Sequence, residues 1–234
     1  MENRESLRTD RRCGLLKRFP PYVWITFAYL AIIDLSVFYG TRPLLPLLPA
    51  HSLETALDAL IPLSTPWVTI YLLSFASWLI TIVWILCEDK QHAYRLCGVY
   101  TIIMIVSTVC FLAYPVTIER PEITGTGLFD DWMRFLYAVD SPTNLCPSLH
   151  VVISYICWRC TLGCKKIPKW YQWFNLVFLI LVCFCILFVK QHFVADIFVG
   201  LAVTEGAIQI GRITRIERIG FAIEKRFRAR RNRA

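Results

Sequence analysis

Residues 171–210 read YQWFNLVFLILVCFCILFV, then KQ, then HFVADIFVGLAVTEGAIQI. Each of the two apolar runs is close to the roughly 20 residues with which an α-helix crosses about 30 Å of hydrocarbon. Only Lys190 and Gln191 separate the runs, so the chain must turn back into the membrane at once. His192 and Asp196 follow this turn directly. The stretch therefore predicts two consecutive membrane-spanning helices with polar side chains at their shared end.

Similar apolar runs recur along the whole chain of 234 residues, of which 56% are hydrophobic and 18% charged. This composition is too apolar for an ordinary soluble domain. We expect an all-α protein, a polytopic membrane bundle of six transmembrane helices. They are predicted at about 22–39, 66–87, 96–114, 148–164, 171–189 and 192–210. The membrane domain, 22–210, would lie between a basic N-terminal segment, 1–21, and a basic tail, 211–234. The first run follows a charged segment and has full length, so we expect a span rather than a cleaved signal peptide.

The basic residues predict how the bundle is oriented. With six spans, 21 of the 25 Lys and Arg residues lie on the side of the two termini. Only Arg42, Arg120, Arg134 and Lys190 lie on the other side. Cytoplasmic loops carry the excess of Lys and Arg, so both termini should be cytoplasmic. We expect the basic termini to bind anionic lipid headgroups and no nucleic acid. The predicted location is a bacterial inner (cell) membrane, with the polar site facing the periplasm or exterior.

The ten cysteines suggest neither a disulfide framework nor a metal centre, because most lie inside apolar runs and there behave as small hydrophobes. Cys157, Cys160 and Cys164 fall on one helix face, but no His or second Cys pair completes a zinc pattern. We therefore expect no metal and no cofactor. Two other carboxylates interrupt apolar runs. Asp34 is expected to pair with Arg159 or to lie near the outer face, and Glu205 to lie nearer the cytoplasm.

His192 and Asp196 are spaced for chemistry. Residues four apart on a helix lie on one face within side-chain reach. A carboxylate that bonds one imidazole nitrogen fixes the tautomer, leaves the other nitrogen free as a nucleophile and stabilises the imidazolium. The pairing also offsets the cost of burying Asp196 in a membrane. The two residues therefore predict a nucleophilic histidine with its orienting partner.

A second polar entry, Pro147-Ser148-Leu149-His150, begins the fourth predicted span. The start of a helix offers unpaired N–H groups to an anion, and Ser148 adds a hydroxyl donor. His150 is suited to protonate a leaving alkoxide. Arg120 and Lys190 lie on the same predicted side and would hold phosphate oxygens. Asn144, in the turn before the helix, is a candidate extra donor.

Taken together, three sequence motifs resemble those of the type-2 phosphatidic acid phosphatase and haloperoxidase superfamily. The motifs are Arg120-Pro121, then Pro147-Ser148-Leu149-His150, then His192-x-x-x-Asp196 with Gly200, and the resemblance covers about residues 96–206. It implies that His192 forms a phosphohistidine, that Asp196 orients it and that His150 assists the leaving group. It also implies that Arg120 and Ser148 bind phosphate. Membrane members of this superfamily act without a metal on phospholipids and polyprenyl diphosphates.

The sequence departs from the family pattern at two cations. The family has a Lys seven residues before the arginine of the first motif, where this chain has Ala113. It has Ser-Arg seven and six residues before the histidine of the third motif, where this chain has Cys185 and Ile186. Lys190 is a candidate replacement for one of them. Ser-Leu-His in place of Ser-Gly-His is closer to the branch that includes inositol phosphorylceramide and sphingomyelin synthases.

Three functions remain open at this point. The first is hydrolysis of a phosphomonoester or diphosphate lipid at the non-cytoplasmic face. The second is transfer of a phospholipid head group to an alcohol acceptor. The third is a non-catalytic lipid-binding protein or a transporter. The sequence favours hydrolysis, and it leaves the lipid and the oligomeric state undetermined.

Overall fold

The computed structural model describes residues 19–232, and within them it is helical, with no strand and one isolated bridge between His51 and Val116. Most of the N-terminal basic segment lies outside this range. The α-helices are α1 (Pro21–Thr41), α2 (Ala56–Leu60), α3 (Val68–Leu86), α4 (Lys90–Ala113), α5 (Leu128–Val139), α6 (Leu149–Thr161), α7 (Lys169–Phe188), α8 (Val194–Thr214) and α9 (Glu217–Arg231). Two single 3₁₀ turns, η2 (Leu45–Leu47) and η3 (Thr65–Trp67), precede α2 and α3.

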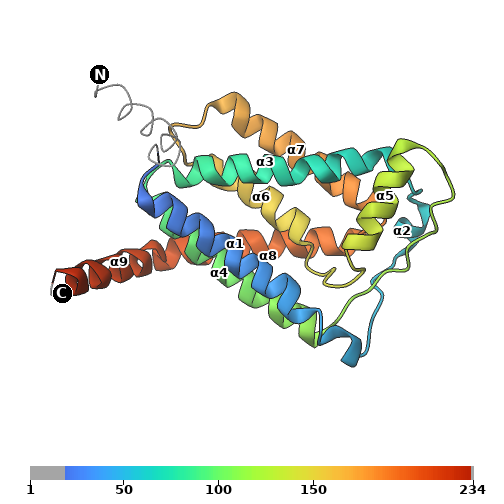
Figure 1. Cartoon of the computed structure of the whole chain (residues 1–234), viewed down its shortest axis with the longest axis horizontal. Helices are drawn as coiled ribbons and strands as arrows, with labels where there is room; N and C mark the ends of the chain where they lie inside the picture. The colour runs from blue at the N-terminus through green and yellow to red at the C-terminus, as the bar shows by residue number, and fades with distance from the viewer. Residues whose placement is uncertain (1–18, 233–234) are drawn as a thin grey trace, which may run out of the picture.

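The long helices lie side by side in a bundle, and α5, α2 and the long loops gather at one end of it (Figure 1). Helices α1, α3, α4, α7 and α8 are long and apolar enough to cross a membrane. Their outer faces are apolar: Ile25 and Ile32 of α1, for example, are 69% and 65% exposed. The protein is therefore of the multi-pass membrane type. Helix α6 has 13 residues and so spans about 20 Å, which leaves the six-span count and the cytoplasmic termini as predictions.

Helix α6 occupies the centre of the bundle. Its neighbouring residues Val151 and Val152 are both fully buried, yet they belong to different hydrophobic clusters. Val152 packs in the cluster formed with α1, α3, α4 and α8, whereas Val151 packs in the cluster formed with α3, α5 and α7. The helix is thus held from both sides, which fixes the orientation of the side chains at its first turn.

Helix α5 lies in the segment 115–147, between the third and fourth predicted spans, where the sequence analysis predicted no helix. Gly127 N donates to the Asp130 carboxylate at 2.9 Å, and this bond caps the first turn. Met133 and Leu136 are buried on one face, while the other face is exposed. The helix is strongly amphipathic, but it is too short and too polar for hydropathy to indicate a membrane span. The Pro, Gly and Thr residues around it are typical of a loop, so the sequence did not indicate a helix here.

Helix α9 docks on α4 at the opposite end of the bundle. Arg215 adopts a left-handed conformation, with φ 51°, and turns the chain out of α8. Ile216 then packs so closely on Gly98 that a Cβ at residue 98 would lie 2.6 Å from it. Arg95 pairs with Glu217 at 3.1 Å, and Lys90 pairs with Glu224. The basic tail therefore begins as a helix that is fixed to the bundle by apolar contacts and ion pairs.

Candidate active site

The first turns of α6 and α8 meet at the end of the bundle that carries α5. The backbone N–H of Ser148 donates to the carbonyl of Asp196 at 3.3 Å, which joins the start of one helix to the start of the other. Gly200 makes the approach feasible, because a Cβ there would lie 3.2 Å from the Ser148 carbonyl and 3.3 Å from Cβ of Val151. The two polar entries expected from the sequence are therefore adjacent in space.

His192 and Asp196 form the pair that their spacing predicts. Nδ1 of His192 lies 3.2 Å from Oδ2 of Asp196, and both side chains are almost fully buried. The same oxygen accepts the N–H of Phe193 at 2.9 Å, so Asp196 also caps helix α8. Within the described residues, Nε2 of His192 makes no hydrogen bond. The carboxylate thus holds a proton on Nδ1 and leaves a lone pair on Nε2.

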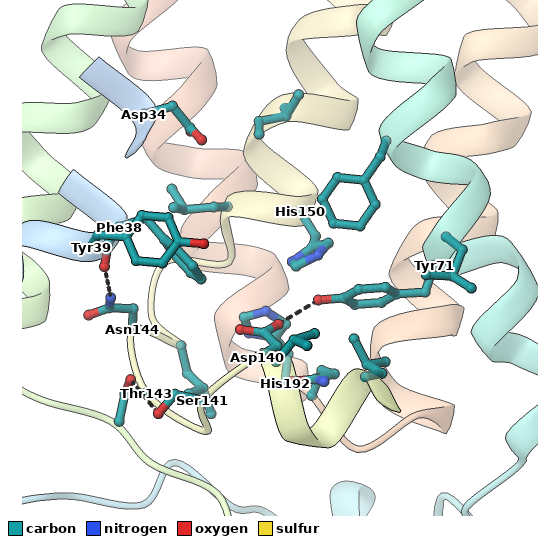
Figure 2. Close-up of a pocket in the computed structure, with 18 of the residues that line it drawn as sticks. Asp34, Phe38, Tyr39, Tyr71, Asp140, Ser141, Thr143, Asn144, His150 and His192 are labelled. Atoms are coloured by element: carbon teal, nitrogen blue, oxygen red, sulfur yellow. Dashed lines mark hydrogen bonds between the residues drawn. The ribbon is translucent and has the colours of Figure 1, made fainter. Parts of the chain in front are cut away.

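His150 faces His192 across a short gap. Their ring centroids are 5.7 Å apart, so both rings can reach one phosphorus atom. The rings of Tyr71 and Trp78 lie 4.5 and 5.4 Å from the ring of His150 and form an aromatic wall against it, of which Figure 2 shows Tyr71. The wall keeps the imidazole directed at His192.

Arg120 approaches the site from the segment before α5. Its guanidinium donates to the carbonyl of Asp140 and to the side-chain oxygen of Gln191, and it stacks on the ring of Tyr137 at 4.7 Å. Burial lowers the pKa of Arg120, while the Asp140 carboxylate opposes that shift, and a guanidinium remains charged. A positive charge is therefore fixed next to the residue that precedes His192.

Asp140 connects several groups around the site. Its carboxylate accepts the hydroxyl of Tyr71 at 2.7 Å and Nη2 of Arg42 at 3.1 Å (Figure 2 shows the bond to Tyr71). Arg42, at the end of α1, lies over the ring of Phe38 at 4.1 Å. A second arginine is thus held close to the site, and both arginines depend on Asp140.

Lys190 and Asn144 are turned to other partners. Nζ of Lys190 donates to the carbonyls of Asp58 and Ile61, which fastens the α7–α8 turn to α2. The Asn144 amide accepts from Thr41 Oγ1 at 3.2 Å and donates to the Phe38 carbonyl at 3.2 Å. In this structure, both side chains hold neighbouring segments in place around the site.

Buried polar atoms without a hydrogen-bond partner gather at this site. In the part of the chain that the structure describes they include Arg120 Nε, Ser148 Oγ, His150 Nε2, Gln191 Nε2 and Asp196 Oδ1. Native proteins leave few buried polar groups unsatisfied, and each calls for an explanation. Their convergence around His192 is that of a site built to receive a polar ligand.

Two cavities meet at His192. One, of about 360 Å³, is lined by His150 and His192 together with mostly apolar side chains from α1, α3, α5 and α6. The other, of about 840 Å³, is lined by His192 and by polar residues of the loops, among them Arg120, Glu119 and Lys190. The histidine thus stands between an apolar compartment, which includes His150, and a polar one, which includes Arg120.

The comparisons with known proteins agree with this arrangement. A family model described as the PAP2 superfamily matches residues 44–210, a range that holds Arg120, Ser148, His150, His192 and Asp196. The chain belongs to the PAP2 superfamily. The resemblance to this superfamily is therefore confirmed, and membership suggests a phosphatase-type function. A search of curated proteins and a search of solved structures both find no match to this chain.

The sequence did not single out Gln191, Tyr71 or Asp140 as members of this PAP2 site. Gln191 is half of the two-residue turn before His192, and its position was the available signal. For Arg42, the sequence indicated only that it is one of the few cations predicted on that side of the membrane. Tyr71 gave no signal, because one tyrosine in an apolar helix is ordinary.

Each of the two intramembrane carboxylates has a partner, and the pairing with Arg159 considered for Asp34 is not formed. Arg159 pairs with Glu205 at 3.2 Å, not with Asp34. Asp34 accepts the hydroxyl of Tyr100 and lines the apolar cavity on the far side from His192. Arg159 lies in the last turn of α6, whereas Asp34 lines the cavity at the first turn of that helix, so Arg159 is too far along the helix to reach Asp34. Among residues 19–232 no group of three or more His, Cys, Asp or Glu side chains is placed to hold a metal ion.

Proposed function

We propose that this PAP2 protein is an integral-membrane lipid phosphatase. It hydrolyses a phosphomonoester or diphosphate lipid through a phosphohistidine, at the face of the membrane that the basic termini do not occupy. One observation carries the proposal: His192, paired with Asp196, and His150 face each other 5.7 Å apart between unpartnered polar donors.

In the first step, the lone pair of His192 Nε2 attacks phosphorus. The bond from phosphorus to the lipid oxygen breaks, its electron pair stays on that oxygen, and His150 supplies the proton. Asp196 stabilises the positive charge that appears on the His192 ring. Arg120, Ser148 and Gln191 donate hydrogen bonds to the phosphoryl oxygens and stabilise their negative charge.

In the second step, His150 takes a proton from a water molecule, whose oxygen attacks the phosphorus of the phosphohistidine. The nitrogen–phosphorus bond breaks, and its electron pair returns to Nε2 of His192. Phosphate leaves and His150 has its proton again. The reaction consumes one water and yields one alcohol and one phosphate, with no oxidant or reductant.

The position of the apolar cavity supports a lipid as the leaving group. His150 lines this cavity, together with Phe38, Leu72 and Phe75. The leaving oxygen must lie beside the acid that protonates it, so the lipid body would occupy the same compartment. The phosphoryl oxygens would then lie on the side of Arg120.

Transfer to an alcohol is the second candidate. The lipid alcohol leaves beside His150 in the first step, and the attacking water or alcohol enters beside His150 in the second step. The cavity on that side is apolar. A lipid alcohol would therefore be accommodated there as readily as the departing one. Product analysis separates the two: a strict transferase releases little free phosphate with water alone and forms a new phosphate ester of the acceptor when the acceptor is added.

The test uses purified protein in detergent with phosphatidate, phosphatidylglycerophosphate and a polyprenyl diphosphate. We expect phosphate release by the wild type and none by His192→Ala. An activated aryl phosphate, whose leaving group needs no acid, then distinguishes the two histidines. His150→Ala should form and accumulate a phosphoenzyme from it, because the second step lacks its base, whereas His192→Ala should form none. Unchanged lipid hydrolysis by His192→Ala would overturn the mechanism.

A further inference from the structure

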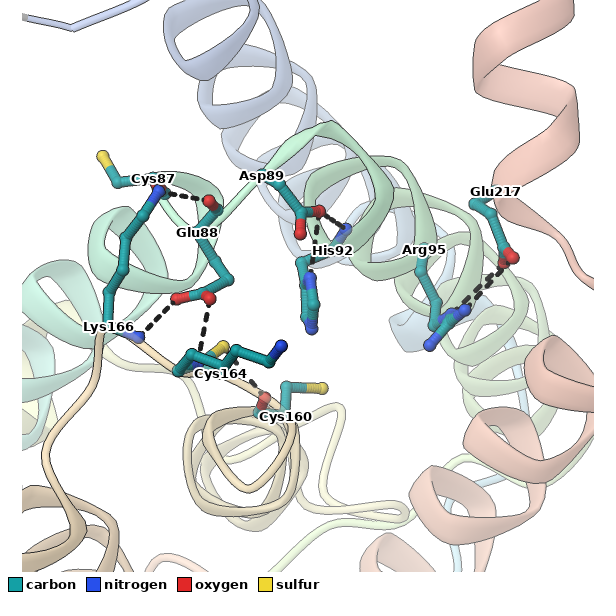
Figure 3. Close-up of polar contacts among 10 residues, drawn as sticks. Cys87, Glu88, Asp89, His92, Arg95, Cys160, Cys164, Lys166 and Glu217 are labelled. Atoms are coloured by element: carbon teal, nitrogen blue, oxygen red, sulfur yellow. Dashed lines mark hydrogen bonds and ion pairs between the residues drawn. The ribbon is translucent and has the colours of Figure 1, made fainter.

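A second polar cluster lies at the other end of the bundle, where α4 begins and α6 and α8 end (Figure 3). His92 hydrogen-bonds Asp89 at 3.0 Å through Nδ1, so Nδ1 is engaged and Nε2 points away from the carboxylate. Glu88 accepts the backbone N–H groups of Lys165 and Lys166 at 2.9 and 3.0 Å. None of these groups takes part in the proposed phosphatase reaction.

A small cavity of about 70 Å³ opens between the helices there. Three arginines from three different helices line it, Arg95 of α4, Arg159 of α6 and Arg212 of α8, and His92 and Gly163 lie at its edge. Buried apolar side chains form its floor, among them Ile85, Leu96, Val99 and Ile208. A cavity needs a volume of about 10–15 Å³ to hold one water molecule. The volume of about 70 Å³ is several times larger, so this cavity has room for a tetrahedral oxyanion.

The arginines keep donors for a ligand. Arg95 bonds Glu217 through Nε and Nη2, and Arg159 bonds Glu205 through Nε and Nη2. Among the described residues, no hydrogen bond involves Nη1 of either arginine or the guanidinium of Arg212. The two ion pairs thus fix two guanidinium groups in place and leave their remaining N–H groups available.

The cavity lining contains no carboxylate. Glu205 and Glu217 bind the arginines from outside the cavity, Asp89 caps α4, and Glu88 binds the α6–α7 loop. Arg212 therefore adds a positive charge that no acidic residue of the lining balances. Guanidinium groups match phosphate geometry closely, since their N–H groups bind paired oxygens.

We propose that this cavity is a binding site for a phosphate group, separate from the catalytic site and at the opposite end of the helices that carry it. The group belongs either to free phosphate or to the headgroup of an anionic lipid. A bound phosphate would join α4, α6 and α8 through Arg95, Arg159 and Arg212. It would thereby hold together the ends of α6 and α8 that lie away from His150 and His192.

Arg212→Gln is the most informative variant, because the Arg212 side chain is exposed and makes no ion pair in the described chain. Arg218→Gln, which changes an exposed arginine of α9 that does not line the cavity, is the matched control that removes the same charge elsewhere. A second pair tests the cavity edge. Gly163 has no positive φ, and a Cβ there meets His92 Nε2 at an ordinary 3.5 Å. Gly163→Asp introduces a repelling carboxylate, and Gly163→Asn is its neutral counterpart.

Thermal unfolding of full-length protein is measured with increasing inorganic phosphate in detergent, at constant ionic strength. It is measured again in nanodiscs of phosphatidylcholine with and without phosphatidylglycerol. All four variants keep the catalytic residues, so phosphate bound there contributes equally to every curve. Because a charge-assisted contact is lost or opposed, the affinity for phosphate derived from the unfolding curves should fall at least about tenfold in Arg212→Gln and Gly163→Asp. It should not fall in their controls.

A response to free phosphate that depends on Arg212 would establish a site for the free anion. A response only to phosphatidylglycerol, with the same dependence, would establish a site for a lipid headgroup. Equal behaviour of Arg212→Gln and Arg218→Gln in both settings would overturn the proposal. So would equal behaviour of Gly163→Asp and Gly163→Asn.

Discussion

Replacing Asp196 by Asn tests the charge of the His192–Asp196 pair separately from its geometry. One carboxylate oxygen, Oδ2, accepts both from Phe193 N–H and at His192 Nδ1, while Oδ1 has no partner. An asparagine can place its oxygen at Oδ2 and keep both bonds, so the tautomer of His192 and the helix cap survive. What it removes is the negative charge 3.2 Å from the ring that becomes positive.

The size of the effect follows from that distance. Two unit charges 3.2 Å apart attract by about 5 kcal/mol at an effective dielectric constant of about 20. The asparagine dipole recovers part of this energy, and each 1.36 kcal/mol of barrier is tenfold in rate. We therefore expect kcat of Asp196→Asn to fall about 10²- to 10³-fold, with thermal stability close to that of the wild type.

The assay measures phosphate release and, in a single turnover, the phosphoenzyme formed from an activated ester. Asp196→Ala serves as the comparison, because it loses both the charge and the cap and should also lose about 1 kcal/mol of folding free energy. If Asp196→Asn kept more than a tenth of the wild-type kcat, the charge would not stabilise the imidazolium and the assigned role of Asp196 would be wrong.

Three further predictions concern other parts of the molecule. Gly200→Ala places a Cβ 3.2 Å from the Ser148 carbonyl, so it should cost about 1–3 kcal/mol in thermal unfolding and lower kcat by shifting the start of α6. Arg120→Lys should lower kcat/KM about tenfold or more, because an ammonium group cannot keep the two separately directed bonds of the guanidinium. The hydrogen bond from Lys90 lowers the pKa of Glu224, so this contact stabilises the docked α9 above pH of about 4.3 and is lost as the pH falls through the lowered pKa. The protection factors of α9 amides, each corrected for the intrinsic exchange rate at its pH, should therefore be lower at pH 3 than at pH 6.

Each of these predictions has a control or a refuting result. Gly206→Ala lies on the same helix with open space around it, and should leave both stability and kcat nearly unchanged. Arg134→Lys alters an exposed arginine paired with Asp131 on α5, and should leave kcat/KM unchanged. Equal losses in either pair would refute the site-specific explanation, and equal protection factors of α9 amides at both pH values would refute its docking by ion pairs.

The sequence predicted the helical class and the residues at the two helix starts, because hydropathy and i,i+4 spacing are local properties. It did not predict α5, whose amphipathic pattern is short and flanked by loop residues. Nor did it predict that Lys190 turns toward α2, since the direction of a long side chain depends on acceptors brought together by the fold. The partnership of Arg159 with Glu205 was missed for the same reason: it depends on how α6 and α8 are aligned.

The short length of α6 has a consequence for where the chemistry takes place. A helix of about 20 Å leaves about 10 Å of the hydrocarbon thickness to other structure. With α6 as the sixth span, that depth would be occupied by the irregular segment before Ser148, in which Asn144 and Leu145 are buried in protein and line the apolar cavity. Irregular backbone is tolerated at such a level only when protein or a water-filled cavity surrounds it. The phosphorus would therefore be attacked below the plane of the surrounding headgroups, and a substrate would have to sink to reach His192. The turnover rate should consequently depend on bilayer thickness. It should be higher in thinner membranes, where the substrate phosphate moves a shorter distance below the headgroups to reach His192.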